Sequence, residues 1–136
     1  MVQMSILYEG HLRCTLTHGP SGAVLATDAP KDNHGKGESF SPTDLIGASL
    51  GACMLTIMGI YARNHELNID GTSVKVTKNM VADPARRIGS LPAEMHLPAS
   101  IPAEKRPVLE NAGLTCPVRK SIHPDIATPV EFIYDL

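Results

Sequence analysis

Residues 41–66 read SPTDLIGASLGACMLTIMGIYARNHE, and this stretch predicts one long helix. Ser41 can cap its first turn, and Asp44 places a negative charge near the positive end of the helix. The middle of the stretch is apolar or small on every face, so we expect it to be buried all round. Gly47 and Gly51 lie one turn apart and leave room for a neighbouring element to approach the backbone closely.

The same stretch raises the question of a membrane span. Residues 45–62 carry no charge and come close to the roughly 20 apolar residues that a spanning helix needs. Glycines and hydroxyl side chains dilute the run, and no second candidate accompanies it. A buried core helix is therefore favoured, and no membrane partner is expected. The first residues show neither a basic start nor a long apolar core, so no signal peptide is expected either.

Strand patterns lie on both sides of this helix. The other predicted elements are strands over residues 4–17, 23–27, 70–80, 88–97 and 129–134, a polar loop over 28–39, a helix over 102–114 and a short helical turn from Cys116 to Ile122. This order, β-β-α-β-β-α-β, predicts an α+β fold with a mostly antiparallel sheet.

One thin sheet from 136 residues would not cover the long helix on every side. We therefore expect residues 1–136 to form a single domain of an obligate homodimer with intertwined cores. In that arrangement, antiparallel sheets pack around the long central helices.

Composition limits the classes of partner. The net charge is −2, which does not favour a phosphate backbone, and the chain has no Trp, three Tyr and two Phe. These are too few aromatic rings for a platform that stacks single-stranded nucleic acid, so no nucleic acid partner is expected. Three widely spaced cysteines do not fit a secreted disulfide scaffold, and a cytoplasmic protein with reduced thiols is predicted. None of the six histidines has metal-ligand spacing, so neither metal nor cofactor is expected.

Cys53 and Cys116 are the candidate reactive groups. Taken alone, Cys53 in the middle of the helix is well explained as a small core residue. Cys116 precedes a helical turn and is followed by Arg119 and Lys120, which are conditions that lower a thiol pKa. A plain capping role explains Cys116 equally well. Cys14 is interpreted as a strand residue.

Two segments together resemble a known pair of motifs. They are GESFSPTDLIGASLGAC at residues 37–53 and CPVRKSIHP at residues 116–124. They resemble the Ser/Asn-Pro-x-x-Leu…Ala-Cys helix and the downstream Cys-Pro of the OsmC/Ohr family, the osmotically inducible protein C and organic hydroperoxide resistance proteins. The first hairpin and the segment Asp83-Pro-Ala-Arg-Arg87 look similar as well, so the resemblance covers nearly the whole chain.

The resemblance implies a swapped α+β homodimer with two sites at the subunit interface. It also implies a thiol-dependent peroxidase that reduces organic hydroperoxides, with Cys53 as the reacting cysteine and Cys116 as its resolving partner. A sulfenic acid at the first thiol would condense with the second to a disulfide, which an external dithiol must reset. Local electrostatics favour Cys116 as the thiolate, and we follow the resemblance in assigning that role to Cys53.

The sequence departs from the hydroperoxide resistance branch at two positions. That branch carries an arginine in the first hairpin turn and a glutamate ten residues before the first cysteine, where this chain has Pro20 and Thr43. Because a thiol in an apolar shell needs a nearby cation to ionise, Arg13 and Glu38 are the candidates to replace the missing pair. The departures point to the broader OsmC-like group.

The departures at Pro20 and Thr43 also leave two other functions open. One is a non-catalytic protein that binds a small hydrophobic ligand on the same fold. The other is a purely structural role for both cysteines.

Overall fold

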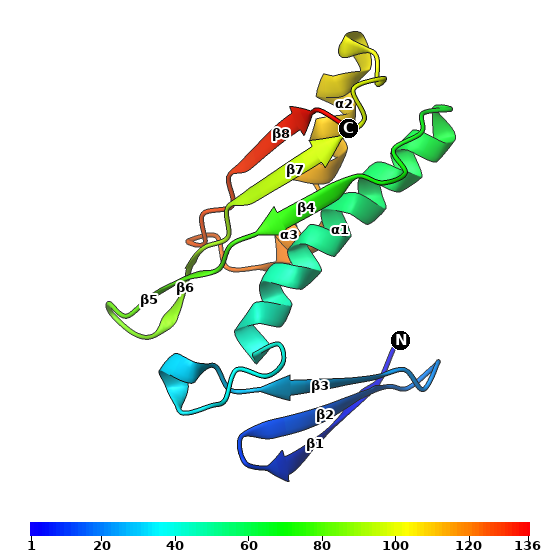
Figure 1. The fold of residues 1–136 in the computed structure, drawn as a ribbon. Coiled ribbons are helices and arrows are strands. Elements are labelled where there is room, and N and C mark those ends of the chain that lie inside the picture. Colours follow the sequence, from blue (N-terminus) through cyan, green and yellow to red (C-terminus); the bar gives the residue numbers. More distant parts are fainter. The chain divides into compact units, whose positions relative to one another are not determined.

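The computed structural model describes residues 1–136, which form two compact units, Met1–Ile46 and Gly47–Leu136. The strands are β1 (Met4–Gly10), β2 (Arg13–His18), β3 (Val24–Asp28), β4 (Ser73–Val76), β5 (Asn79–Val81), β6 (Arg87–Ser90), β7 (Ala93–Leu97) and β8 (Val130–Tyr134). The helices are α1 (Pro42–Asn64), α2 (Arg106–Leu114) and α3 (Pro117–Ser121), with short 3-10 turns at Lys31–Asn33 and Ala103–Lys105. This mixture of helix and sheet confirms the predicted α+β class (Figure 1).

The first unit is built on an antiparallel sheet in the order β1-β2-β3 (Figure 1). The predicted single strand over residues 4–17 is wrong, because the chain reverses at His11 and Leu12, whose φ angles of 55° and 62° are left-handed. Tyr8 pairs with Cys14 across this two-residue turn, so even-numbered side chains stay on one face of the sheet before and after it. The alternating pattern therefore runs through the turn and conceals it.

The start of α1 is fixed as the sequence predicts. The N–H of Asp44 donates to the Ser41 hydroxyl at 3.1 Å, and the N–H of Ser41 donates to the Asp44 carboxylate at 2.8 Å. These reciprocal bonds satisfy two backbone donors that the first turn would otherwise leave without a partner. The carboxylate also lies at the positive end of the helix dipole.

The second unit contains a three-stranded sheet in the order β4-β7-β8 and a separate β5-β6 hairpin (Figure 1). The predicted strands over residues 70–80 and 88–97 are each divided in two, the second of them at Leu91 and Pro92. Proline has no N–H to give to a strand ladder, which is why the strand ends there. The sheet is antiparallel except where β8 joins β7 in parallel.

Helix α1 approaches this sheet through its glycines. A methyl group at Gly51 would come within 3.1 Å of both Val74 and Val76 of β4, which confirms the predicted close approach. Further along the same face of α1, a methyl group at Gly113 of α2 would meet Met58 at 2.8 Å. The core that these contacts enclose consists of Leu50, Met54, Met58, Ile88, Leu91, Ala93, Met95, Leu97, Ile101, Leu109 and Cys116.

Burial of α1 is one-sided in the single chain. The buried residues of the helix are Gly47, Leu50, Gly51, Met54, Met58 and Ala62. Ile46 and Ile60 are exposed, so the expectation of burial on every side is not met within one copy. The helix is long and apolar enough to cross a membrane by length and composition, a test that the core helix of a soluble protein also passes.

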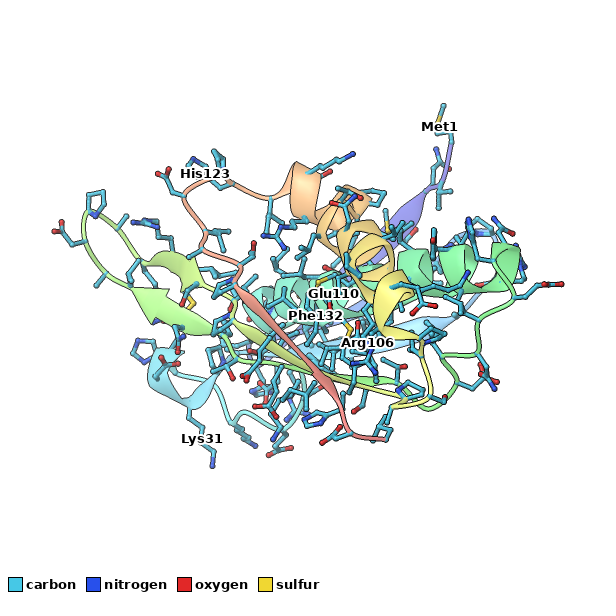
Figure 2. All side chains as sticks on the ribbon, turned by 90° about the horizontal axis from the view of Figure 1, so that it is seen from above. Met1, Lys31, Arg106, Glu110, His123 and Phe132 are labelled. Carbon is cyan, nitrogen blue, oxygen red and sulfur yellow. The ribbon has the colours of Figure 1, made fainter.

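Helix α2 fixes the last strand. Figure 2 shows Arg106 and Glu110 projecting from α2, and both contact Tyr134 at the end of β8. The Tyr134 hydroxyl donates to Glu110 at 2.9 Å, while the Arg106 guanidinium lies 4.0 Å from the centre of its ring. Burial, and next the bond to Glu110, raise the pKa of Tyr134 well above its ordinary value, so the phenol stays protonated as a donor.

Candidate functional site

Cys116 lies at the start of α3, as the sequence predicts. It is the N-cap residue of that helix, with Pro117 at the first helical position, and its sulfur accepts the Arg119 N–H at 3.5 Å. Proline suits this position because the N–H it lacks would have no helical partner there. One guanidinium nitrogen of Arg119, Nη1, is also buried and has no hydrogen-bond partner.

The Cys116 thiol is fully buried, with 0% of the residue exposed. Burial is the largest influence on its pKa and raises it, and the neighbouring Cys53 thiol raises it further. The hydrogen bond from the Arg119 N–H lowers the pKa of Cys116, but the effect of burial is larger and the net shift is upward. The expectation that Cys116 has a lowered pKa is therefore wrong, because it considered the charges near Cys116 in the sequence and not the apolar core around the sulfur.

Cys53 lies on α1, half-buried and next to the fully buried Met54. It packs against the core that contains Cys116 and lies close enough to that thiol to raise its pKa. The fold thus brings together two thiols that are 63 positions apart in the sequence, both within the unit Gly47–Leu136. A half-buried thiol beside a buried one has the arrangement needed for oxidation at the first and disulfide formation with the second.

We expect Cys116 to alkylate slowly at neutral pH. In a Cys53→Ser, Cys14→Ser variant, iodoacetamide should modify Cys116 well below the rate for free cysteine, because burial disfavours the thiolate and limits access. The rate should rise with pH through a midpoint above that of free cysteine. Mass spectrometry of quenched samples gives the rate. A midpoint below that of free cysteine would show that the N–H groups at the start of α3 affect the Cys116 pKa more than burial does.

Arg13 and Glu38 lie in the other unit, Met1–Ile46, and contact each other there. Arg13 is the first residue of β2 and not, as expected, part of a strand that begins at residue 4. Its Nη2 lies 2.7 Å from the Glu38 carboxylate, which is 57% exposed in the loop before α1. The same nitrogen donates to the carboxylate of Asp28 at 3.2 Å.

Asp28 is a residue that sequence reasoning missed. It ends β3, is 1% exposed, and accepts the Glu38 backbone N–H at 3.0 Å as well as the Arg13 guanidinium. The Glu38 N–H holds the pKa of Asp28 below its ordinary value, and the positive charge of Arg13 lowers it further, so the carboxylate is ionised at neutral pH. The register of the hairpins could have indicated Asp28 from the sequence. With the turn placed at His11 and Leu12, Asp28 pairs directly with Arg13.

A hollow of about 440 Å³ adjoins this cluster in the first unit. Its lining residues are Gly37, Glu38, Ser39, Phe40 and Asp44. Phe40 is half exposed and supplies an apolar wall beside the carboxylate of Glu38.

Three further residues discussed in the sequence analysis, Thr43, Pro20 and Cys14, lie at a helix start, in a turn and in a strand. Thr43 shares a hydrogen bond of 3.2 Å with the Ser41 hydroxyl at the start of α1, and Pro20 lies in the turn between β2 and β3. Cys14 is half-buried on β2, where it pairs with Tyr8 on one side and Thr27 on the other. Its surroundings match the predicted strand position.

Residues 35–131 match the family model for OsmC, described as OsmC-like protein. The chain is also similar to a crystal structure from Psychrobacter arcticus 273-4, of a protein named for osmotic stress induction and a detoxification response. The two are 46% identical, the match covers 97% of this chain and 96% of that one, and the TM-score is 0.91. No curated protein matches the sequence.

Two more distant structures show the same fold. One is an organic hydroperoxide resistance protein, OsmC, from Legionella pneumophila, with 14% identity, coverage of 98% and 96%, and a TM-score of 0.78. The other is the organic hydroperoxide resistance protein OhrB of Bacillus subtilis, with 18% identity, coverage of 97% of both chains, and a TM-score of 0.71.

Proposed function

Because the chain belongs to the OsmC family, we propose that it is a thiol-dependent peroxidase that reduces organic hydroperoxides. The observation that carries the proposal is the pair of thiols in one chain, with Cys53 half-buried and Cys116 buried beside it. The names of the Legionella and Bacillus proteins support hydroperoxides as the substrate class.

The exposure of the two thiols supports the assignment of roles. An attacking thiol must meet the substrate, and Cys53 is the more accessible of the two. Cys116 is held in the thiol form by burial, which suits a resolving group that reacts only after Cys53 has been oxidised. Both family resemblance and structure therefore favour Cys53 as the nucleophile.

The reaction proceeds in three balanced steps. The Cys53 thiolate attacks an oxygen of the hydroperoxide, the O–O bond breaks, and the leaving alkoxide takes up a proton to become an alcohol. The resulting sulfenic acid then condenses with the Cys116 thiol, forming the disulfide and releasing water. An external dithiol reduces this disulfide back to two thiols and is itself oxidised to a disulfide.

Arg13 is the cation that we assign to the thiolate. The role follows the family resemblance, in which a cation that accompanies the reacting thiol disperses the negative charge that moves to oxygen in the transition state. Glu38 lies 2.7 Å from the Arg13 guanidinium and is one of its two carboxylate partners, the other being Asp28 at 3.2 Å. These two residues replace the arginine and glutamate for which this chain has Pro20 and Thr43.

We assign the working form to a cytoplasmic homodimer. Large apolar side chains stay exposed on β1 and α1 of the single chain, among them Ile6, Tyr8 and Ile60, and a second copy would cover them. The family model covers residues 35–131, the end of the first unit and nearly all of the second, which supports the assignment of residues 1–136 to one OsmC-like domain.

A kinetic experiment separates this function from the two alternatives. The reduced protein is mixed with cumene hydroperoxide or hydrogen peroxide, and sulfenic acid at Cys53 is trapped with dimedone at successive times. We expect oxidation faster than that of free cysteine, faster with the organic peroxide, and followed by a disulfide to Cys116. Oxidation no faster than free cysteine would instead favour a ligand-binding protein, or thiols with a structural role.

A further inference from the structure

Asp28 is the one charged side chain among the buried residues. A carboxylate is rarely buried unless other groups hold its charge. The carboxylate of Asp28 connects two separate parts of the first unit, because its Oδ2 accepts the Arg13 guanidinium of β2 at 3.2 Å and the Glu38 backbone N–H at 3.0 Å. It therefore ties the start of β2 to the loop that precedes α1.

We propose that Asp28 is the residue that positions Arg13 for reaction, and that Glu38 is a second, dispensable partner. This inference rests on the proposed function, in which Arg13 stabilises the Cys53 thiolate. It differs from that function in giving the main positioning role to a carboxylate other than Glu38.

The difference in burial between Asp28 and Glu38 indicates which of the two carboxylates holds Arg13 in position. Glu38 makes the shorter contact with Arg13, 2.7 Å against 3.2 Å for Asp28, but its side chain is 57% exposed and that of Asp28 is 1% exposed. Water and salt screen an exposed ion pair, so it contributes little to the preferred position of the guanidinium. The Arg13 side chain is 40% exposed in both contacts, but the contact with Asp28 has one partner shielded from water, so it is screened less and is the stronger constraint.

The backbone around Asp28 is also the more firmly held. The Asp28 N–H donates to the Phe40 carbonyl at 3.0 Å, and the next N–H, of Ala29, donates to the Leu12 carbonyl at 3.2 Å. These bonds fix Asp28 against the hairpin turn that directly precedes Arg13. Glu38, by contrast, lies in a loop outside the strands and helices.

The arrangement leaves Arg13 able to bind an anion. Both carboxylate contacts use the same guanidinium nitrogen, Nη2. Neither carboxylate bond uses the Nε and Nη1 donors, so these remain available to an anion such as a thiolate. If Glu38 turns away, the pair of Arg13 and Asp28 stays electrically neutral and in place.

Neutral variants of the full chain test the assignment. We expect Asp28→Asn, which keeps the shape of the side chain and removes its charge, to slow sulfenic acid formation at Cys53 by about 10²-fold, the cost of a misplaced reacting group. Arg13→Ala should slow it about as much. Glu38→Gln should stay within about fivefold of the unmodified protein, as for the loss of an exposed ion pair. Glu9→Gln, an exposed carboxylate bonded to Thr15 in the same unit, is the matched control and should change nothing.

A double variant distinguishes positioning from a general loss of stability. If Asp28 acts through Arg13, adding Asp28→Asn to Arg13→Ala should cause no further slowing, whereas independent effects would multiply. Circular dichroism confirms that each variant is folded. Any of three results would overturn the assignment. The effects of Asp28→Asn and Arg13→Ala could multiply in the double variant, Asp28→Asn could react as fast as the unmodified protein, or Glu38→Gln could react as slowly as Arg13→Ala.

A second measurement covers the case in which Asp28→Asn does not fold. The side-chain ¹⁵N signal of Arg13 reports directly whether the guanidinium is held, and exposed Glu38 can be replaced without removing a buried charge. We expect this signal to be retained in Glu38→Gln, and its loss would overturn the proposal. Failure of the proposed function has a different signature, because it appears as slow oxidation in the unmodified protein before any variant is compared.

Discussion

Cys53→Ser is expected to abolish peroxide turnover while leaving the protein folded. The serine hydroxyl has nearly the size of the thiol, so the contacts of α1 with the core are largely kept. It cannot form a sulfenic acid or a disulfide, so the reaction has no first step. We expect turnover of cumene hydroperoxide with a dithiol reductant to fall by about 10³-fold or more, as is usual when a nucleophile is removed.

Two matched variants show whether this loss is specific. Cys14→Ser removes the half-buried thiol of β2 and should leave turnover unchanged. Cys116→Ser should still allow one equivalent of peroxide to react, but the sulfenic acid would then persist and oxidise further to sulfinic acid. Intact-mass spectra distinguish these products. Full turnover in Cys53→Ser would reject the assignment of the nucleophile.

The sequence was sufficient where local chemistry determines the structure. The reciprocal bonds of Ser41 and Asp44, and the cap of α3 at Cys116, follow from residues within one helical turn. The close packing at Gly51 follows from the absence of a side chain. The long apolar helix and the Cys-Pro motif together were enough to identify the family that the comparisons confirm.

Non-local packing explains most of what the sequence did not predict. Nothing near Cys116 in the sequence indicates the core that raises its pKa, and nothing near β8 indicates that it joins β7 in parallel. The turn at His11 and Leu12 was missed because pairing across it preserves the alternation of side chains. That error also hid Asp28, since the pairing of Asp28 with Arg13 depends on where the hairpin reverses.

Ile6→Asp is expected to dissociate the proposed homodimer. Ile6 pairs with Leu16, which pairs with Leu25, so the three side chains share one face of the β1-β2-β3 sheet. Tyr8 lies on the same face, and Ile6 and Tyr8 are 62% and 61% exposed in the single chain. Soluble monomers rarely expose so continuous an apolar surface, and a second copy of the chain is the occupant we propose.

A carboxylate in the middle of this face would have to be buried without a partner, once in each subunit of a symmetric dimer. We expect the dissociation constant to rise by at least about 100-fold, comparable with the loss of an interface hot spot. Analytical ultracentrifugation over a concentration series measures it.

Leu7→Asp provides the matched control for this experiment. Leu7 follows Ile6 on the same strand and is equally exposed at 62%, but it pairs with Thr15, which pairs with Ala26, on the opposite and more polar face of the sheet. Both substitutions add one negative charge to β1 in place of an exposed aliphatic side chain, and they differ chiefly in the face that receives the carboxylate. Dissociation by Ile6→Asp alone would therefore locate the interface on the Ile6 face. Equal effects of both substitutions would indicate a general destabilisation of the sheet, and a stable Ile6→Asp dimer would show that the second copy binds elsewhere.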